Sequence, residues 1–191
     1  MKIKNLFQSI LVLIIFTIIL SFIYPFTIYI TSLVFFKNKA NGSLIYKDKK
    51  IVGSKFLGQK FSSEKYFHSR PSFYDYNGIN SGASNYSQTS KKYKNSITQK
   101  SQNFRKINNL DNEISIPIDA VTYSGSGLDP HITHYNAIIQ AKRVAQARNV
   151  NEEVLVGLIK KNLTKQKIFG RRCLNVLEMN LLLDEKYPVK K

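Results

Sequence analysis

A serine–glycine run is the feature of this sequence that comes nearest to a site for chemistry. Ser124-Gly125-Ser126-Gly127 has the composition of a turn whose backbone N–H groups could hold phosphate. The run completes neither the G-x-x-x-x-G-K-[ST] nor the G-x-G-x-x-G spacing. A tight turn before a helix accounts for the glycines equally well, and we expect Gly125 and Gly127 to supply backbone angles closed to other residues.

Two histidines, His131 and His134, form an H-x-x-H pair. A zinc site needs three or four ligands, and no cysteine pair, H-E-x-x-H motif or nearby acidic cluster completes one. We therefore favour a capping or surface role and predict no metal site. A hydrolase triad of Ser126, Asp129 and His131 lacks the G-x-S-x-G nucleophile elbow. By its chemistry alone, the sequence suggests a binding or assembly module.

Cys173 is the only cysteine, so an internal disulfide is impossible. Arg171 and Arg172 precede it and could lower the pKa of its thiol. Packing into the core is the commoner role of a free cysteine, and we favour that role.

The chain is strongly basic, with 29 Lys+Arg against 12 Asp+Glu and a net charge of +17. This charge permits binding to nucleic acid, anionic lipid or an acidic protein and selects none of them. The lysines are scattered and no nucleic-acid-binding motif is present, so we predict no nucleic-acid partner.

Residues 5–36 contain no charged side chain. A membrane span needs about 20 apolar residues, so we predict a transmembrane helix over about residues 6–30 within an anchor of residues 1–36. Pro25 is expected to kink this helix or to mark its outer end. A cleaved signal peptide would have a shorter apolar region, so we favour an uncleaved anchor. Lysines flank both ends, and the positive-inside rule is weak for long domains, so charge does not fix the orientation.

Residues 37–191 are predicted to form one small α+β domain. Its first part, residues 43–53, has the pattern of a β-hairpin around Lys47-Asp48-Lys49. Residues 72–112 show no sustained period, and we predict mostly loop with at most one short helix.

Two regular helices are predicted further along. Thr133 can cap a helix over about residues 134–149, and Asn151 can cap the next one. Residues 175–183 are interpreted as a strand that turns into a terminal helix. The predicted buried face of the second helix comprises Val154, Leu155, Leu158 and Ile159.

Six distinct sequence blocks follow one another along the chain. They are Gly53-Ser54-x-x-Leu57-Gly58-Gln59-x-Phe61, Tyr66-Phe67-x-x-Arg70-Pro71-Ser72, Ser81-Gly82-Ala83-Ser84-Asn85, Asp119-Ala120-Val121-Thr122-x-Ser124-Gly125-Ser126-Gly127-Leu128-Asp129-Pro130-His131-Ile132, Gln140-x-x-Arg143-Val144-Ala145-x-Ala147-Arg148 and Asn175-Val176-Leu177-x-x-Asn180-Leu181-x-Leu183-Asp184. With the N-terminal anchor, these blocks cover nearly the whole chain. Together they resemble the C subunit of the bacterial Kdp potassium-transporting P-type ATPase, the KdpC family.

The resemblance implies a non-catalytic accessory subunit of a four-subunit potassium import pump in the bacterial cell membrane. Its partners would be a channel-like subunit, a P-type ATPase subunit and a small single-helix subunit, together with the lipid bilayer. The complex would use ATP, Mg²⁺ and K⁺, whereas this chain would hold no cofactor of its own. The sequence lacks the Asp-Lys-Thr-Gly phosphorylation motif, so it is not the P-type subunit. Residues 37–191 would lie on the outer face.

The resemblance leaves two mechanisms open: a structural cap on the channel-like subunit, or a catalytic chaperone that raises ATP affinity. For the second, the family proposal places nucleotide contacts at Ser124, Gly125, Ser126, Gly127 and Gln140. The other signature positions of the six blocks are expected to serve assembly. An independent membrane-tethered extracellular binding domain is the alternative from a different functional class.

Overall fold

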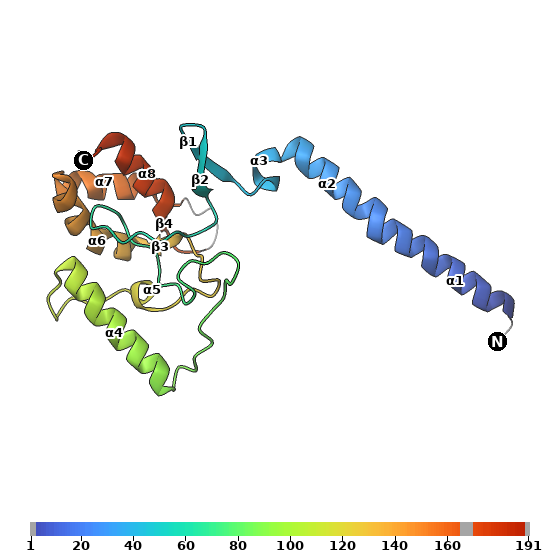
Figure 1. The fold of residues 1–191 in the computed structure, drawn as a ribbon, viewed down its shortest axis with the longest axis horizontal. Coiled ribbons are helices and arrows are strands. Elements are labelled where there is room, and N and C mark those ends of the chain that lie inside the picture. The colour runs from blue at the N-terminus through green and yellow to red at the C-terminus, as the bar shows by residue number, and fades with distance from the viewer. Residues whose placement is uncertain (1–2, 165–169, 190–191) are drawn as a thin grey trace. The chain divides into compact units, whose positions relative to one another are not determined.

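The computed structural model describes residues 3–164 and 170–189 of the chain. The chain divides into two compact units, Met1–Leu44 and Ile45–Lys191. The first is helical, and the second mixes helices with short strands (Figure 1). A single apolar N-terminal helix followed by a small mixed domain confirms the predicted α+β class.

The first unit is built around one long apolar helix. It comprises α1 (Ile3–Ile18), a π-helical turn η1 (Ile19–Ile23) and α2 (Tyr24–Phe35), followed by the short α3 (Lys37–Ala40). An 18-residue stretch within Ile3–Phe35 has a mean hydropathy of 2.7, and none of that stretch is buried within the protein. Among the described residues it is the one helix long and apolar enough to cross a membrane.

Pro25 does not end this helix, contrary to one of the two expectations for it. It occupies the first turn of α2, which continues to Phe35. Proline lacks an N–H donor and its ring crowds the carbonyl four residues earlier. The π turn Ile19–Ile23 lies immediately before it, where an extra residue per turn accommodates such a disruption. The apolar helix is consequently longer than the predicted span of residues 6–30.

The second unit begins with the predicted hairpin. Strands β1 (Leu44–Lys47) and β2 (Lys50–Ser54) pair in a two-stranded sheet. Asp48 and Lys49 form the turn with φ of +51° and +63°. Positive φ at both central residues matches the turn twist that two-residue hairpins favour.

The helix α4 (Lys91–Asn108) corrects the prediction of mostly loop for this region. Ser90 caps it by accepting a hydrogen bond from the Tyr93 N–H at 3.2 Å. Its half-buried side chains Tyr93, Ile97 and Phe104 follow a helical period, but polar residues separate them. So few apolar positions give a weak periodic signal, although the cap and the spacing were visible in the sequence.

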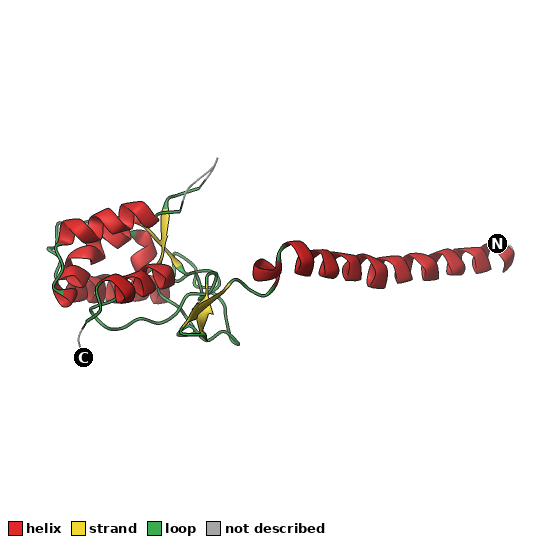
Figure 2. Ribbon diagram, turned by 90° about the horizontal axis from the view of Figure 1, so that it is seen from above, coloured by secondary structure: helices red, strands yellow, loops and turns green. Residues whose placement is uncertain are grey.

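The remaining elements are helices and two short strands of the same unit, and Figure 2 shows helices in red beside the short strands in yellow. They are α5 (Ile118–Val121), β3 (His131–Thr133), α6 (His134–Arg148), α7 (Glu152–Asn162), β4 (Cys173–Asn175) and α8 (Val176–Lys186). The strands β3 and β4 are antiparallel, with Ile132 opposite Leu174. The helices after Thr133 and Asn151, and the strand-to-helix change near Asn175, are confirmed.

The hydrophobic core lies among α6, α7, α8 and the β3–β4 pair. Its fully buried members include Ile132, Leu174 and three alanines of α6. Small alanine side chains let α7 pack closely against α6. Leu155 and Ile159 of α7 are buried as predicted, whereas Val154 is 43% exposed, so its place on the buried face was wrong.

The two neighbours Leu155 and Val154 give a matched test of this core. We expect Leu155→Ala to lower the free energy of unfolding by about 2–5 kcal/mol, because it leaves a cavity. Val154→Ala removes a solvent-exposed side chain and should change it by less than about 0.5 kcal/mol. Denaturant unfolding of the full chain in detergent measures both. Equal losses from the two variants would contradict the packing of α7.

Candidate functional site

Residues 64–68 belong to no helix or strand, and their backbone contacts α6 and α8 from the exposed Glu64 to the half-buried His68. Phe67 in this segment is completely buried. Buried backbone N–H and C=O groups need partners, and here side chains from α6 and α8 provide them. This arrangement is the most elaborate polar site in the described part of the chain, and we call residues 64–68 the threaded segment.

The side-chain amide of Gln140 on α6 makes the two hydrogen bonds to the His68 backbone that a neighbouring β-strand would make. Its Oε1 accepts from the His68 N–H at 2.7 Å, and its Nε2 donates to the His68 carbonyl at 3.2 Å. The same amide also donates to Asn136 Oδ1 and accepts from the Arg143 guanidinium, both at 2.9 Å. Gln140 is 1% exposed, so all of its hydrogen-bonding capacity shown here is used inside the domain.

Asn180 on α8 makes the same pair of hydrogen bonds to the Phe67 backbone. Its Oδ1 accepts from the Phe67 N–H at 2.9 Å, and its Nδ2 donates to the Phe67 carbonyl at 3.0 Å. Two consecutive residues of the threaded segment are therefore held by primary amides from two different helices.

Arg143 adds a cation to this network. It donates to the carbonyls of Glu64 and Tyr66 and, through Nε, to Asn108 Oδ1 at 3.0 Å. Burial lowers the pKa of Arg143 to about 10, and the Glu64 carboxylate opposes this effect. Arg143 therefore connects α6 to the C-terminal end of α4.

Arg148 closes the far end of the segment. It donates to the Lys65 carbonyl at 2.7 Å and to Asp184 Oδ1 at 2.8 Å, with its side chain fully buried. The Tyr66 hydroxyl donates to the other oxygen of Asp184 at 3.0 Å. Burial and the Asp184 carboxylate raise the pKa of Tyr66. Removing one partner of such a buried pair leaves an uncompensated charge, which is costly.

Asp119 on α5 holds the start of α6. It accepts from the Thr133 N–H at 2.7 Å, from the Thr133 hydroxyl at 3.0 Å and from Asn136 Nδ2 at 3.0 Å. Thr133 in turn caps α6 through the Asn136 N–H. Asp119 thus fixes the helix that carries the side chains around the threaded segment.

The serine–glycine run forms a tight turn that packs against other loops. Ser124 is buried and its N–H donates to the Pro71 carbonyl at 3.1 Å. Gly127 has φ +71°, and a Cβ there would lie 3.0 Å from the Gly82 carbonyl oxygen. Gly125 has neither a positive φ nor a near neighbour. The expectation of a glycine-only backbone is therefore right for Gly127 and wrong for Gly125.

Gln140 makes none of its hydrogen bonds to this turn. Gln140 borders a cavity of about 210 Å³ together with His68, Lys100 and Asn136. None of the four residues 124–127 lines that cavity. Gly125 and Ser126 are exposed. The nucleotide contacts proposed for these five residues stay a prediction.

The signature residues that follow the β1–β2 hairpin connect strand β2 to the loop around Leu128. Gln59 donates to the Val52 carbonyl at 2.7 Å, and the Gly58 N–H donates to the Leu128 carbonyl at 2.7 Å. A Cβ on Gly58 would lie 2.7 Å from the Asp129 carbonyl oxygen. Gly53 packs in the same way against the Gln59 amide, and Ser54 is buried beside it.

The other signature residues occupy two further groups. Arg70 forms an ion pair with Asp129 at 3.0 Å, and Ser72 accepts from the Tyr76 N–H at 2.9 Å. The Pro130 carbonyl accepts from the N–H of Val176, next to the α8 cap. Three signature residues lie in the loop before α4, half-buried or exposed: Ser81, Ser84 and Asn85. Asn175 caps α8 and donates to the Lys55 carbonyl.

Sequence reasoning missed Asn136 and Asn108 as members of this network. Asn136, Gln140 and Arg143 fall at i, i+4 and i+7 on α6, which is a polar stripe on a helix that otherwise packs into the core. That spacing places the three side chains on one face and was the available signal. Cys173 is half-buried, and burial followed by the Asp129 and Asp119 charges raises the pKa of its thiol, outweighing the lowering by Arg171.

Comparison with known proteins decides the family. The model for "K+-transporting ATPase, c chain", KdpC, matches residues 6–185. The chain belongs to the KdpC family. The potassium-transporting ATPase KdpC subunit of Mycobacterium tuberculosis (strain ATCC 25618 / H37Rv) is 39% identical over 185 residues, covering 95% of this chain and 98% of the relative.

Two further KdpC subunits support this assignment. That of Flavobacterium psychrophilum is 37% identical over 182 residues, covering 95% of this chain and 98% of the relative. That of Koribacter versatilis is 38% identical over 190 residues, covering 97% of each chain. The predicted resemblance is confirmed, and the chain is a KdpC subunit of a potassium-transporting ATPase with one candidate membrane helix.

The two glycines of the turn give a matched pair of variants. Gly127→Val places a β-branched residue at positive φ beside a backbone oxygen, and should cost about 1–3 kcal/mol of unfolding free energy. Gly125→Val meets open space at an ordinary angle and should be tolerated. Thermal unfolding of the two variants measures the difference. Equal stability would show that the Gly127 conformation is not required.

A second pair tests the threaded segment. Gln140→Leu leaves the N–H and C=O of His68 without partners, at about 1–3 kcal/mol for each unsatisfied group. Gln146→Leu makes the same change at an exposed position of the same helix and serves as the control. Hydrogen exchange should speed up at residues 67–68 in the first variant alone. Unchanged protection there would contradict the pairing described.

His68 predicts a pH dependence of stability. Burial, followed by the Arg143 charge, lowers the pKa of His68 to about 4. Between this value and about 6.5 the unfolded chain binds more protons than the folded one. Stability from this group is therefore complete above pH 6.5 and falls as pH drops toward 4, by at most about 3 kcal/mol.

Unfolding of the His68→Gln variant checks this, because glutamine can still donate to the Ser63 carbonyl that the imidazole contacts at 3.1 Å. The variant should lose less stability than the parent between these pH values. Parallel pH profiles would assign the dependence to other groups.

Proposed function

We propose that this subunit is a membrane-anchored cap that stabilises the assembly of the potassium pump on its outer face. Its partners are the channel-like subunit, on which the domain sits, the P-type subunit and the small single-helix subunit. ATP, Mg²⁺ and K⁺ are used by the complex, and the chain supplies no reacting group. The similarity to relatives that are each named a KdpC subunit of a potassium-transporting ATPase supports this proposal.

The observation that carries the proposal is the internal use of the signature side chains. Each of four signature side chains bonds to residues 64–68, and their other bonds go to further residues inside the domain: Gln140, Arg143, Arg148 and Asn180. Side chains used in this way build a rigid body with a fixed surface. A preorganised surface is what a docking module needs, because it reduces the entropy lost on binding.

The catalytic-chaperone mechanism is the second candidate, and the same geometry disfavours it. Gln140 could contact a nucleotide only by giving up bonds to His68 and Asn136. A domain on the outer face would also be separated by the bilayer from cytoplasmic ATP. We therefore favour the cap.

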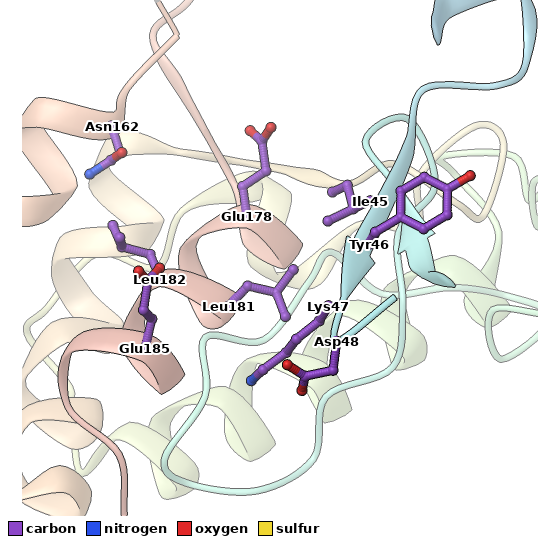
Figure 3. A pocket seen from close by; sticks show the side chains of 9 residues that line it. All are labelled: Ile45, Tyr46, Lys47, Asp48, Asn162, Glu178, Leu181, Leu182 and Glu185. Carbon is purple, nitrogen blue, oxygen red and sulfur yellow. The ribbon is translucent and has the colours of Figure 1, made fainter. Parts of the chain in front are cut away.

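A groove on the domain is our candidate contact with the channel-like subunit (Figure 3). It has a volume of about 630 Å³ and lies between the hairpin and α8. Ile45, Leu181 and Leu182 supply its apolar lining. Tyr46 at its edge is 61% exposed, and aromatic side chains of this kind often dominate binding energy at interfaces.

The charge of the groove indicates the chemistry of its occupant. Three carboxylates and one lysine line it: Asp48, Glu178, Glu185 and Lys47. Glu178 is paired with Lys55 at 2.8 Å, so Asp48 and Glu185 supply the excess negative charge over Lys47. An acidic groove is unusual on a chain of net charge +17. We propose that it receives an apolar segment of the channel-like subunit that carries a basic side chain.

Co-purification from detergent-solubilised membranes tests this function. Tagged chain should recover a channel-like potassium subunit and a P-type ATPase, identified by mass spectrometry. Tyr46→Ala should reduce that recovery about tenfold, the loss expected at an interface hot spot. Ile79→Ala, which truncates an apolar side chain that is 93% exposed and lies outside the groove, is the control.

Each outcome has a separate meaning. Recovery of the chain alone, stable and abundant, would overturn the cap and favour an independent tethered domain. Full recovery with Tyr46→Ala would keep the cap but remove this groove as its contact.

A further inference from the structure

A second hollow of the domain brings together three arginines and a histidine from three parts of the chain. It has a volume of about 720 Å³. Arg70 comes from the loop after the threaded segment, His134 from the first turn of α6, and Arg171 and Arg172 from the residues before β4. This convergence has no part in the cap proposed above.

Two of these side chains have an unsatisfied buried atom. Arg70 Nε and His134 Nε2 are the side-chain atoms in the described residues that are buried without a hydrogen-bond partner. An unpaired buried polar atom is costly and rare in folded proteins. Both belong to residues that line this hollow.

The acidic groups nearby are already engaged. Asp119 accepts three hydrogen bonds from Thr133 and Asn136. Asp129 accepts from Arg70 Nη1 and from the His131 N–H, each at 3.0 Å. Arg171 and Arg172 are exposed and have no side-chain partner among the described residues. Asp129 neutralises Arg70, whereas Asp119 keeps its negative charge because its three donors are neutral. Arg171 and Arg172 outnumber that one carboxylate, so the lining keeps a net positive charge, to which the amino end of α6 adds.

We propose that this hollow binds a phosphate group. A phosphate carries up to two charges and several acceptor oxygens, so it can contact more than one guanidinium at once. A single carboxylate has two oxygens and matches one arginine. Arginines that converge from separate segments favour the larger anion. The phosphate comes either from free inorganic phosphate or from a lipid headgroup, which share this chemistry.

The side chains at the mouth agree with a phosphate that is joined to an apolar group. Ile118 is 74% exposed and Tyr135 is 48% exposed, and both line the hollow. Exposed apolar side chains beside a cationic site suit a ligand with a charged head and an apolar remainder. This favours the lipid source over the free ion.

The experiment uses the full chain in zwitterionic detergent. Binding of inorganic phosphate is followed by ³¹P NMR, and retention of short-chain phosphatidylglycerol or phosphatidylcholine by native mass spectrometry. The Arg171→Ala/Arg172→Ala variant should bind the phosphate ligand about tenfold more weakly. The matched control, Lys91→Ala/Lys92→Ala, removes two exposed charges from α4 and should bind normally.

A charge-preserving variant separates geometry from charge. Arg171→Lys/Arg172→Lys should restore part of the affinity, because lysine supplies the charge without the planar fork. Thermal unfolding checks that all variants fold alike, as expected for exposed positions.

The outcomes divide as follows. Loss of phosphate binding in the arginine-to-alanine variant, with normal binding in the lysine control, supports the site. Binding of inorganic phosphate then indicates the free ion as ligand. Retention of phosphatidylglycerol alone indicates a lipid headgroup. If the Lys91→Ala/Lys92→Ala control bound phosphate equally weakly, the loss would be due to overall charge and the proposal would be overturned. Binding of neither phosphate form would also overturn it, and an acidic peptide that bound instead would assign the hollow to a protein partner.

Discussion

The central constraint in this domain is that the backbone of residues 67 and 68 packs against α6 and α8 without a neighbouring strand. Residues 67 and 68 must find partners for their N–H and C=O groups, because such groups are costly to bury unpaired. Gln140 and Asn180 meet this need with primary amides, whose donor and acceptor reproduce one rung of a β-ladder. The positions of α6 and α8 follow from that requirement, because each helix must present its amide at the correct height.

The other polar contacts keep those two helices in place. Asp119 fixes the start of α6, while Arg148 joins its end to Asp184 of α8. Helix capping, ion pairing and the amide contacts therefore act on the same two elements. Such networks specify one arrangement when every member is satisfied. This explains why the residues that identify the family are mostly interior, and why identification of the family does not by itself reveal a reacting group.

Sequence reasoning succeeded where local rules decide the outcome. The hairpin, the caps Thr133 and Asn151, and the apolar N-terminal helix all follow from neighbouring residues. It failed where distant segments decide. The helix α4 has few apolar residues and is recognised by its packing. The space for a side chain at Gly127 depends on Gly82, far away in the chain. The role of Gln140 depends on His68, which is 72 residues distant.

The ties between residues 66–67 and α8 have a consequence for biosynthesis. Tyr66 and Asp184 are 118 residues apart, and Phe67 and Asn180 are 113 apart. Since α8 leaves the ribosome more than a hundred residues after Tyr66 and Phe67, the middle of the domain is without these partners until α8 has been made. Contacts of such long range also form slowly. The apolar anchor, made first, meets the membrane while the domain behind it is still incomplete. Any chain that terminates before α8 would lack these contacts and leave buried backbone groups unsatisfied. Such a chain would be open to proteases, so truncated copies of the subunit would be removed before they assemble.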